Sequence, residues 1–515
     1  MKKIIILVFL VLASSLLYGS LLARTPVHLN QDELGFSLNA YSVAKTGFDE
    51  NGRLLPFYFW HLGVMWATPI IVYLASLFLL FMPISEITIR LPSVMVGIID
   101  VILIYFLTKK LFSSEKWGMI AAILLALTPV HFIQSRLLLD NLYIVPFVLG
   151  WLFLMAYYLD KKKIWLLFLA GLVLGIGIHS YHAAKVMMPI YLLMTFIFLL
   201  PQIKKQKKLV LILIVGFILP ILPIIPWLVQ YPDTLIDQVR YTRLYDTNLN
   251  PLSGVISLLS PENIIHKIAI FIAYFDPYFL FTRGDVSLIH STAKSGVFLW
   301  PVVIFLPLGI YQAFKERTRI NLLLIVGVFT SPIAAALVGD HYRISRALVM
   351  LPFAIILATY GIKFLISHKS YLLRAGCHLL LILILIQFAY FWYDYMKDYR
   401  IRSYEWFKYN IPGALERVIV ENQKKRATAI YLDNRIEFID RYWRFYTIKN
   451  NQTQLMVQTY YFEPADINLE SLPANTLILY HFNDVDGQKT QIGPFTKVAD
   501  IIEPDGTSRF YLYRN

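Results

Sequence analysis

The chain has 515 residues, of which 57% are hydrophobic and 16% charged, and its mean hydropathy is +0.59. These values exclude a soluble protein of this size and indicate a polytopic α-helical membrane protein. The net charge of +14 does not indicate a nucleic-acid-binding protein, because the basic residues form short clusters between apolar runs rather than one basic module.

The apolar runs begin directly after Lys2 and Lys3 and recur to about residue 393. A helix needs about 20 apolar residues to cross the hydrocarbon of a membrane, so the sequence predicts about 11 transmembrane helices. The predicted spans are residues 4–23, 91–108, 118–135, 139–159, 164–178, 183–200, 209–229, 297–314, 320–338, 345–366 and 372–393. This assignment places the lysine-rich clusters on the cytoplasmic side. The first segment also resembles a signal peptide, but we expect it to be retained.

Residues 58–82 are apolar enough to cross the membrane, but Pro69 lies in the middle of this segment. If the segment crossed, Lys2 and Lys3 would lie on the opposite side from every later basic cluster. We therefore predict an interfacial or re-entrant segment within an extracytoplasmic loop at residues 24–90.

This loop opens with two adjacent carboxylates, Asp32 and Glu33, and continues to Arg53. A carboxylate near a substrate hydroxyl can act as a general base. The alternative is structural, because acids in the first turn of a helix interact favourably with its dipole. Arg53 is a candidate substrate-binding residue.

Further polar residues lie at the predicted outer ends of the spans. Arg136 and Asp140 have the i,i+4 spacing that would place them on one face of a helix, either as a site or as a local ion pair. The turn at residues 179–185 contains His179, Tyr181, His182 and Lys185. These side chains are candidates for contact with an anionic substrate or a metal. Zinc requires three or four ligands, and the sequence has no HExxH motif.

The second long outer loop, residues 230–296, ends in an aromatic stretch that contains Arg283 and Asp285. Interfacial aromatic residues anchor loops, and this stretch is also a candidate wall for a cavity. The turn at residues 339–346 carries His341, Arg343 and Arg346. Guanidinium groups suit phosphate. We favour an anion site there over simple snorkelling to the interface.

Residues 396–515 are less apolar and predict a small extracytoplasmic soluble α/β domain. Its predicted strands are residues 429–432, 455–462, 476–482 and 509–513, and its predicted helices are 404–422 and 435–446. The single cysteine, Cys377, lies in a predicted span and allows no disulfide within one chain.

The pattern resembles the GT-C class of membrane glycosyltransferases that use lipid-linked sugars, especially bacterial relatives of protein O-mannosyltransferases and aminoarabinose transferases. The resemblance covers about residues 1–395. It rests on Asp32-Glu33, Asn39-Ala40, Gly52 to Pro56, Arg90-Leu91-Pro92-Ser93, Arg136 with Asp140, Tyr274 to Asp285, and Arg343 to Arg346. The chain departs from many relatives at residues 179–182.

The resemblance implies inverting transfer of a sugar from a polyprenyl monophosphate to a hydroxyl of a lipid, glycan or protein. The transfer would take place at the outer face of the plasma membrane. Asp32 would be the base, Glu33 would orient it or bind the acceptor, and Asp140 is the second catalytic candidate. The donor phosphate would be bound by Arg343, Arg346, Lys185 and Arg136. Residues 53, 179, 181, 182, 283, 285 and 341 are substrate-binding candidates. No cofactor is required, and a divalent metal stays open.

Two other functions fit a polytopic chain with polar residues at one end of its helices. One is a transporter or flippase of a lipid-linked sugar, although such proteins tend to show internal repeats and broken helices at the membrane midplane. The other is a noncatalytic scaffold for glycan assembly. Transfer of sugar by the purified protein would distinguish the enzyme from both.

Overall fold

The computed structural model describes residues 2–242, 244–258, 260–481 and 490–515. The chain folds into two compact units. The helical unit comprises Met1–Ser20, Leu55–Leu74 and Arg90–Tyr393. The sheet unit comprises Leu21–Leu54, Ala75–Ile89 and Asp394–Asn515.

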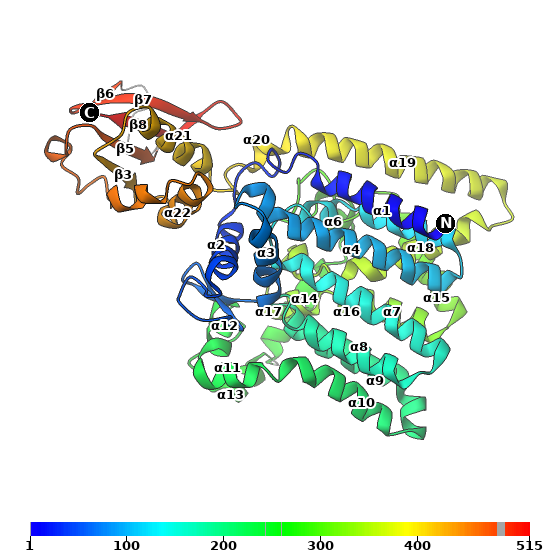
Figure 1. Ribbon diagram of the computed structural model, residues 1–515. Helices are drawn as coiled ribbons and strands as arrows, with labels where there is room; N and C mark the ends of the chain where they lie inside the picture. Colours follow the sequence, from blue (N-terminus) through cyan, green and yellow to red (C-terminus); the bar gives the residue numbers. More distant parts are fainter. Residues whose placement is uncertain (1, 243, 259, 482–489) are drawn as a thin grey trace. The chain divides into compact units, whose positions relative to one another are not determined.

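The helical unit is built around long apolar helices, of which α7, α8, α9 and α10 lie side by side (Figure 1). The helices up to residue 230 are α1 (Lys2–Gly19), α4 (Glu86–Phe112), α5 (Glu115–Ala126), α6 (Pro129–Gln134), α7 (Val145–Lys161), α8 (Ile164–Gly177), α9 (Ala184–Lys205), α10 (Lys208–Ile218) and α11 (Ile224–Gln230). Those that follow are α12 (Thr234–Thr242), α13 (Pro251–Ser257), α14 (Pro261–Ala273), α15 (Val302–Glu316), α16 (Arg319–Thr330), α17 (Ile333–Val338), α18 (Met350–Ile366) and α19 (Tyr371–Met396).

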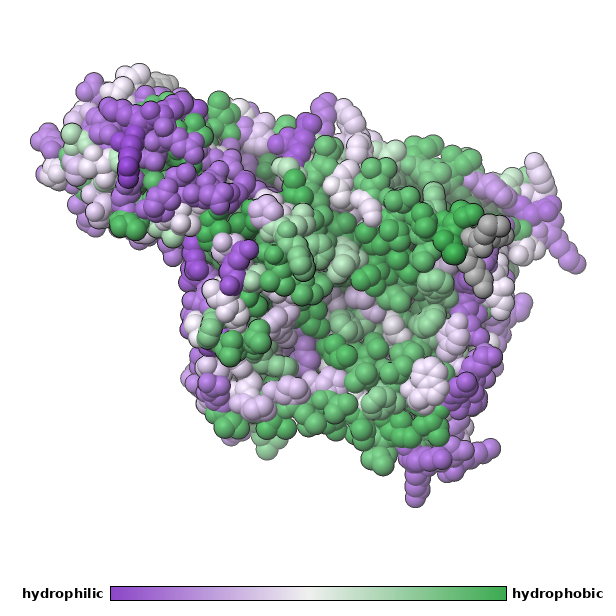
Figure 2. All heavy atoms as spheres, viewed as in Figure 1, coloured by the Kyte–Doolittle hydropathy of each residue, from purple (hydrophilic) through white to green (hydrophobic). Residues whose placement is uncertain are grey.

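The length and composition of the helices make the chain a multi-pass membrane protein. Among the described residues, five helical segments are long and apolar enough to cross a membrane, and α10 with α11 adds a sixth if this pair, bent by 41°, is one span. Large hydrophobic side chains cover much of the exposed helical surface (Figure 2). The predicted span 118–135 is interrupted between α5 and α6, whereas the predicted span 320–338 corresponds to one of the five segments, Arg319–Val338, which contains α16 and α17. The number of 11 spans stays a prediction.

Helices α15 and α18 make the closest backbone contact in this unit. A Cβ atom at Gly309 would lie 1.7 Å from the Leu357 carbonyl oxygen, and one at Gly361 would lie 2.0 Å from that of Phe305. Small residues allow helices in a membrane to pack backbone to backbone. Any larger residue at either position would force the two helices apart.

The apolar segment 58–82 is not one continuous helix. It begins with a hairpin of β1 (Phe59–His61) and β2 (Met65–Ala67), and α3 (Pro69–Phe81) follows. Pro69 is the first residue of α3, where its missing N–H costs nothing. The helix has 13 residues and is shorter than a full span.

The sheet unit contains a six-stranded sheet in the order β4-β3-β5-β8-β7-β6. Strand β3 pairs in parallel with β4 and β5, and the other pairs are antiparallel. The strands are β3 (Ala429–Asp433), β4 (Thr459–Phe462), β5 (Thr476–His481), β6 (Gln491–Ile492), β7 (Phe495–Ile502) and β8 (Ser508–Arg514). The unit's helices include α2 (Gln31–Thr46), α20 (Tyr399–Ser403), α21 (Ile411–Lys424) and α22 (Ile439–Lys449).

The predicted α/β character of the C-terminal region is confirmed, with differences in detail. The predicted strand 455–462 begins as a 3₁₀ turn over Thr453–Gln458, and only its second half is extended. The predicted helix 404–422 starts later, at Ile411, because Asn410 caps it and Pro412 favours the first turn. Strand β7 was not predicted, and Phe482 at the end of a predicted strand lies outside the described residues.

Candidate functional site

Three polar stretches that are far apart in the sequence come together in the helical unit. They are the 3₁₀ turn Asp140–Ile144, the turn between α8 and α9, and the turn between α17 and α18. We call their meeting point the polar cluster. It contains Thr68, Asp140, Tyr181, His182, Lys185, Asp340, Ser345 and Arg346.

Asp140 and Lys185 are an acid and an amine of the polar cluster that interact electrostatically. Thr68 Oγ1 lies 3.2 Å from Asp140 Oδ2, to which it donates, and 3.3 Å from the Ser180 carbonyl oxygen. The Lys185 ammonium donates to Gln238 Oε1 and lies 5.1 Å from the centre of the Tyr58 ring. Lys185 is therefore placed by neutral partners as well as by the charge of Asp140.

Tyr181 and His182 are held uncharged at neutral pH by their surroundings. Burial raises the pKa of Tyr181, which Arg346 opposes and Asp140 adds to. Burial lowers the pKa of His182 well below its ordinary value, and the positive charges of Lys185 and Arg346 lower it further. The buried His182 Nε2 has no hydrogen-bond partner within the described part of the chain. It is available to a bound molecule.

The turn before α18 is fixed by two carboxylates. Asp340 forms ion pairs with Arg346 and, at 3.8 Å, with Arg343. Asp285 accepts hydrogen bonds from the backbone N–H of Ile344 at 2.6 Å and of Ser287 at 2.8 Å. Asp285 is thus committed to backbone contacts, and burial raises its pKa.

Several predicted site residues contact groups other than the polar cluster. Arg136 and Asp140 are not on one helix face, because α6 ends at Gln134 and a turn follows; this expectation was wrong. The fully buried Arg136 donates to the Tyr18 carbonyl oxygen at 2.7 Å. His179 Nε2 donates to the Pro220 carbonyl oxygen at 3.0 Å.

Three other predicted residues are exposed or locally paired. Arg283 and His341 are exposed, and the His341 ring meets that of His266 edge to face at 5.8 Å. Arg53, in the sheet unit, forms an ion pair with Asp49 at 2.6 Å. Its guanidinium thus has a partner within its own turn.

Asp32 and Glu33 lie in the first turn of α2, in the sheet unit. Asn30 is the N-cap, and its side chain accepts from the Asp32 N–H at 2.8 Å. Glu33 completes the capping box by accepting from the Asn30 N–H at 3.1 Å, and it is fully buried. Asp32 is exposed. Glu33 therefore has a structural role at the start of α2, whereas the Asp32 side chain is accessible to solvent.

Helix α22 holds α2 and its flanking residues within the sheet unit. The Tyr442 hydroxyl donates to the Leu29 carbonyl oxygen at 3.0 Å, and burial together with the charges of Glu33 and Asp32 raises the pKa of Tyr442. At the other end of α2, Glu50 forms ion pairs with Arg444 at 2.7 Å and Arg441 at 3.1 Å.

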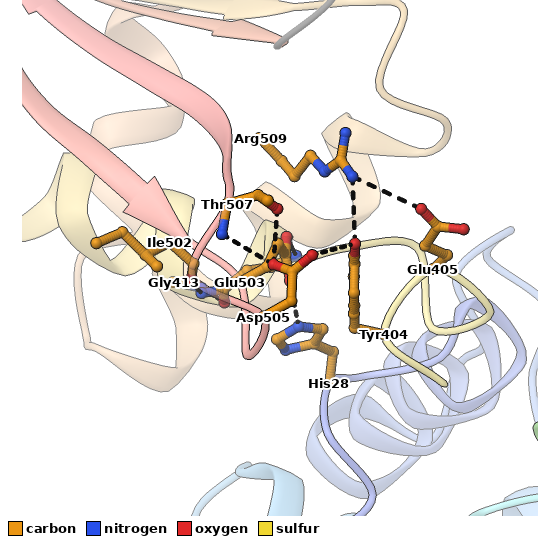
Figure 3. Close-up of polar contacts among 10 residues, drawn as sticks. His28, Tyr404, Glu405, Gly413, Ile502, Glu503, Asp505, Thr507 and Arg509 are labelled. Carbon is orange, nitrogen blue, oxygen red and sulfur yellow. Dashed lines mark hydrogen bonds and ion pairs between the residues drawn. The ribbon is translucent and has the colours of Figure 1, made fainter. Parts of the chain in front are cut away.

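A second set of contacts ties the segment before α2 to the C-terminal strands (Figure 3). His28 Nε2 lies 3.0 Å from Glu503 Oε2, and Glu503 Oε1 accepts from the Asn410 N–H at 2.6 Å. Beside them, the Tyr404 hydroxyl donates to Asp505 at 2.9 Å. The acidic turn of α2 is thus held from both sides by the C-terminal region.

Sequence reasoning missed four members or neighbours of the polar cluster: Thr68, Gln238, Asp340 and Ser345. Asp340 had a local signal, because it stands three residues before Arg343 in the same turn. Thr68 and Gln238 had none. No group of three or more His, Cys, Asp or Glu side chains suited to a metal occurs within the described ranges, so the metal hypothesis gains no ligand set there.

Part of the chain matches the model of a known protein family. Residues 67–227 match the model of the dolichyl-phosphate-mannose-protein mannosyltransferase family. These residues contain Thr68, Asp140 and the whole turn between α8 and α9. No curated protein sequence matches the chain.

Two solved structures are similar in fold. ArnT from Cupriavidus metallidurans bound to undecaprenyl phosphate has a TM-score of 0.54 and 10% identity, over 99% of this chain and 98% of ArnT. The archaeal oligosaccharyltransferase AglB from Archaeoglobus fulgidus, in complex with an inhibitory peptide and a dolichol-phosphate, has a TM-score of 0.52 and 14% identity. The match covers 86% of this chain and 64% of AglB, which is less than two thirds of that protein. The chain therefore has the fold of these GT-C glycosyltransferases, and its residues 67–227 resemble the mannosyltransferase family.

Proposed function

We propose that the protein transfers a sugar from a polyprenyl monophosphate to a hydroxyl acceptor, with inversion at the anomeric carbon. The observation that carries this proposal is the polar cluster. Two basic residues from separate segments, Lys185 at the start of α9 and Arg346 before α18, lie in it beside the unpartnered nitrogen of a neutral His182. Such a set of donors suits a phosphate group whose negative charge grows as the sugar leaves.

The reaction requires one bond to form and one to break. The acceptor oxygen bonds to the anomeric carbon, while the bond from that carbon to the phosphate oxygen breaks. The acceptor proton passes to a general base, for which we propose Asp32, the exposed acid of α2. Lys185 and Arg346 stabilise the departing phosphate, with Arg343 as a further candidate. The neutral His182 donates or accepts a hydrogen bond without adding charge.

The lipid-linked donor is supported by the two similar structures, which are complexes with undecaprenyl phosphate and with dolichol-phosphate. Both are polyprenyl monophosphates. We further propose that the acidic loop and the sheet unit lie on the extracytoplasmic side of the plasma membrane, because the lysine clusters occupy the other ends of the helices. The acceptor would be a lipid, a glycan or a protein hydroxyl.

The test is transfer by the purified protein. The protein in detergent is incubated with a panel of polyprenyl-phosphate sugars and a membrane extract, and donor loss and glycosylated product are followed by mass spectrometry. We expect one donor to be consumed and its sugar to appear on an acceptor. If the protein instead moves the sugar lipid across the membrane of reconstituted vesicles and forms no new glycosidic bond, the result would support a transporter.

A further inference from the structure

A pocket lies between the C-terminal ends of α15 and α18, with a volume of about 420 Å³. Its lining includes Gln312, Glu316, Tyr360, Lys363, His368 and Lys369. The polar cluster lies at the other end of α18, since Arg346 precedes this helix. At about 1.5 Å per residue, the helix separates the two sites by roughly 25 Å. The pocket is therefore not part of the polar cluster.

The walls of the pocket are preformed. Gly309 and Gly361 bring the backbones of α15 and α18 into contact. The pocket opens beyond this contact, where the longer side chains of Gln312 and Lys363 follow the glycines. Because α15 and α18 are in backbone contact, they have little freedom to move together and fill the pocket.

The charge of the pocket is positive. Neither Lys363 nor Lys369 forms an ion pair with any residue that the structure describes. The Lys363 ammonium instead lies 4.9 Å from the centre of the Phe112 ring. Glu316 is the acid of the lining, and its two oxygens accept from the amides of Gln312 at 3.1 Å and Asn321 at 3.0 Å. The carboxylate is hydrogen-bonded by neutral groups and keeps its charge, so two lysines against one acid leave the lining with a net positive charge.

His368 adds a hydrogen-bond donor. Its Nδ1 accepts from the Ser370 N–H at 3.0 Å, so in the neutral ring the proton is on Nε2. The lining thus combines two ammonium groups with an imidazole donor, which suits an oxyanion. Exposed aromatic side chains stand next to it on α15, where Tyr311 is 56% and Phe314 54% exposed. Exposed aromatic residues beside lysines mark the interface of a membrane.

We propose that this pocket binds the phosphate headgroup of an anionic membrane phospholipid, whose acyl chains lie against the apolar face of α15. Basic pockets between transmembrane helices are known to bind anionic headgroups. A free phosphate ion shares the charge but cannot use the aromatic surface. The lipid is therefore the occupant that accounts for both the lysines and the exposed rings.

The test compares the wild-type protein with Lys363→Gln/Lys369→Gln in phosphatidylcholine nanodiscs that contain increasing phosphatidylglycerol. Retained lipid is counted by native mass spectrometry. Each lysine near a membrane surface contributes about fivefold to the binding of anionic lipid, so we expect roughly 25-fold weaker retention in the double variant. Lys204→Gln/Lys205→Gln, outside the pocket, is the matched control and should retain the lipid as the wild type does.

Two further measurements keep the result specific. Lys363→Arg/Lys369→Arg should keep the lipid, and all variants should unfold at the wild-type temperature in phosphatidylcholine alone. Equal loss in the pocket and control variants, or no loss in either, would overturn the proposal. Displacement of phosphatidylglycerol by inorganic phosphate at a comparable concentration would also overturn it and assign the pocket to a soluble anion.

Discussion

The polar cluster of the helical unit and the first turn of α2 in the sheet unit both contain two carboxylates, but their surroundings differ. In the polar cluster, Asp140 interacts with Lys185 from a different segment of the chain, and Asp340 forms an ion pair with Arg346 of its own turn. In α2, Glu33 is buried in a capping box while its neighbour is exposed. Two acids that are adjacent in sequence, Asp32 and Glu33, thus have different surroundings. Two acids that are 200 residues apart, Asp140 and Asp340, lie in the same polar cluster.

The largest effect is expected from removing the basic side chains of the polar cluster. Lys185→Met and Arg346→Gln should each lower kcat/KM about 10²- to 10³-fold, the cost of losing one group that stabilises transition-state charge. Lys204→Met, at the far end of α9, should have no effect. Steady-state transfer assays measure this. Unchanged kcat/KM in both site variants would exclude the polar cluster as the donor-phosphate site.

Because Asn30 caps α2, its replacement should lower the stability of the protein. Asn30→Ala removes the side chain that accepts from the Asp32 N–H and should cost about 1 kcal/mol. Asp32→Asn should leave the unfolding temperature unchanged, because the exposed side chain is not the cap. Thermal unfolding in detergent compares the two. A larger loss in Asp32→Asn than in Asn30→Ala would contradict this prediction, because it would show that Asp32 stabilises the start of α2 more than Asn30 does.

The buried His182 predicts a pH dependence of stability. Its pKa is lowered in the folded protein, so the unfolded chain binds the proton first as the pH falls below about 6.5. Stability from this group is complete above that pH and falls by up to about 1.4 kcal/mol per pH unit below it. Unfolding temperatures between pH 7.5 and 5 should fall less steeply for His182→Gln than for the wild type. The exposed His341→Gln is the control, and parallel curves for all three proteins would contradict the prediction.

The smallest expected effect concerns the ion pairs that hold the end of α2. Arg444→Gln removes one of the two partners of Glu50, and Arg441 stays. Because these arginines are partly exposed, the loss should be at most about 1 kcal/mol, with transfer activity retained. A combined unfolding and activity measurement tests this. Loss of activity without loss of stability would give α22 a direct part in the reaction.

The sequence predicted the class of fold and the separate pieces of the site. Apolar runs identified the membrane helices, and short apolar stretches identified β3 and β5. The turns around His182 and Arg346 were each expected to meet an anion. Their convergence was not predictable, because 164 residues separate them (346 − 182) and no local pattern reports such a contact.

The errors have physical causes. The spacing of Arg136 and Asp140 suggests a helix face only if the helix continues, and it ends at Gln134. Asp285 was a candidate because its stretch was expected beside the other outer turns, and its carboxylate accepts hydrogen bonds from the backbone N–H groups of Ile344 and Ser287. Hydrogen bonds between a side chain and a distant backbone N–H cannot be predicted from a single sequence.

The central claim is tested most directly by one comparison of turnover. Asp32→Asn and Glu33→Gln are assayed beside the wild type with the donor that it consumes. Glutamine at the third helical position can still complete a capping box, so Glu33→Gln should fold and keep much of its activity. Asp32→Asn should fold and lose about 10²- to 10⁴-fold in kcat, the typical contribution of a general base. Near wild-type turnover in folded Asp32→Asn would contradict the account.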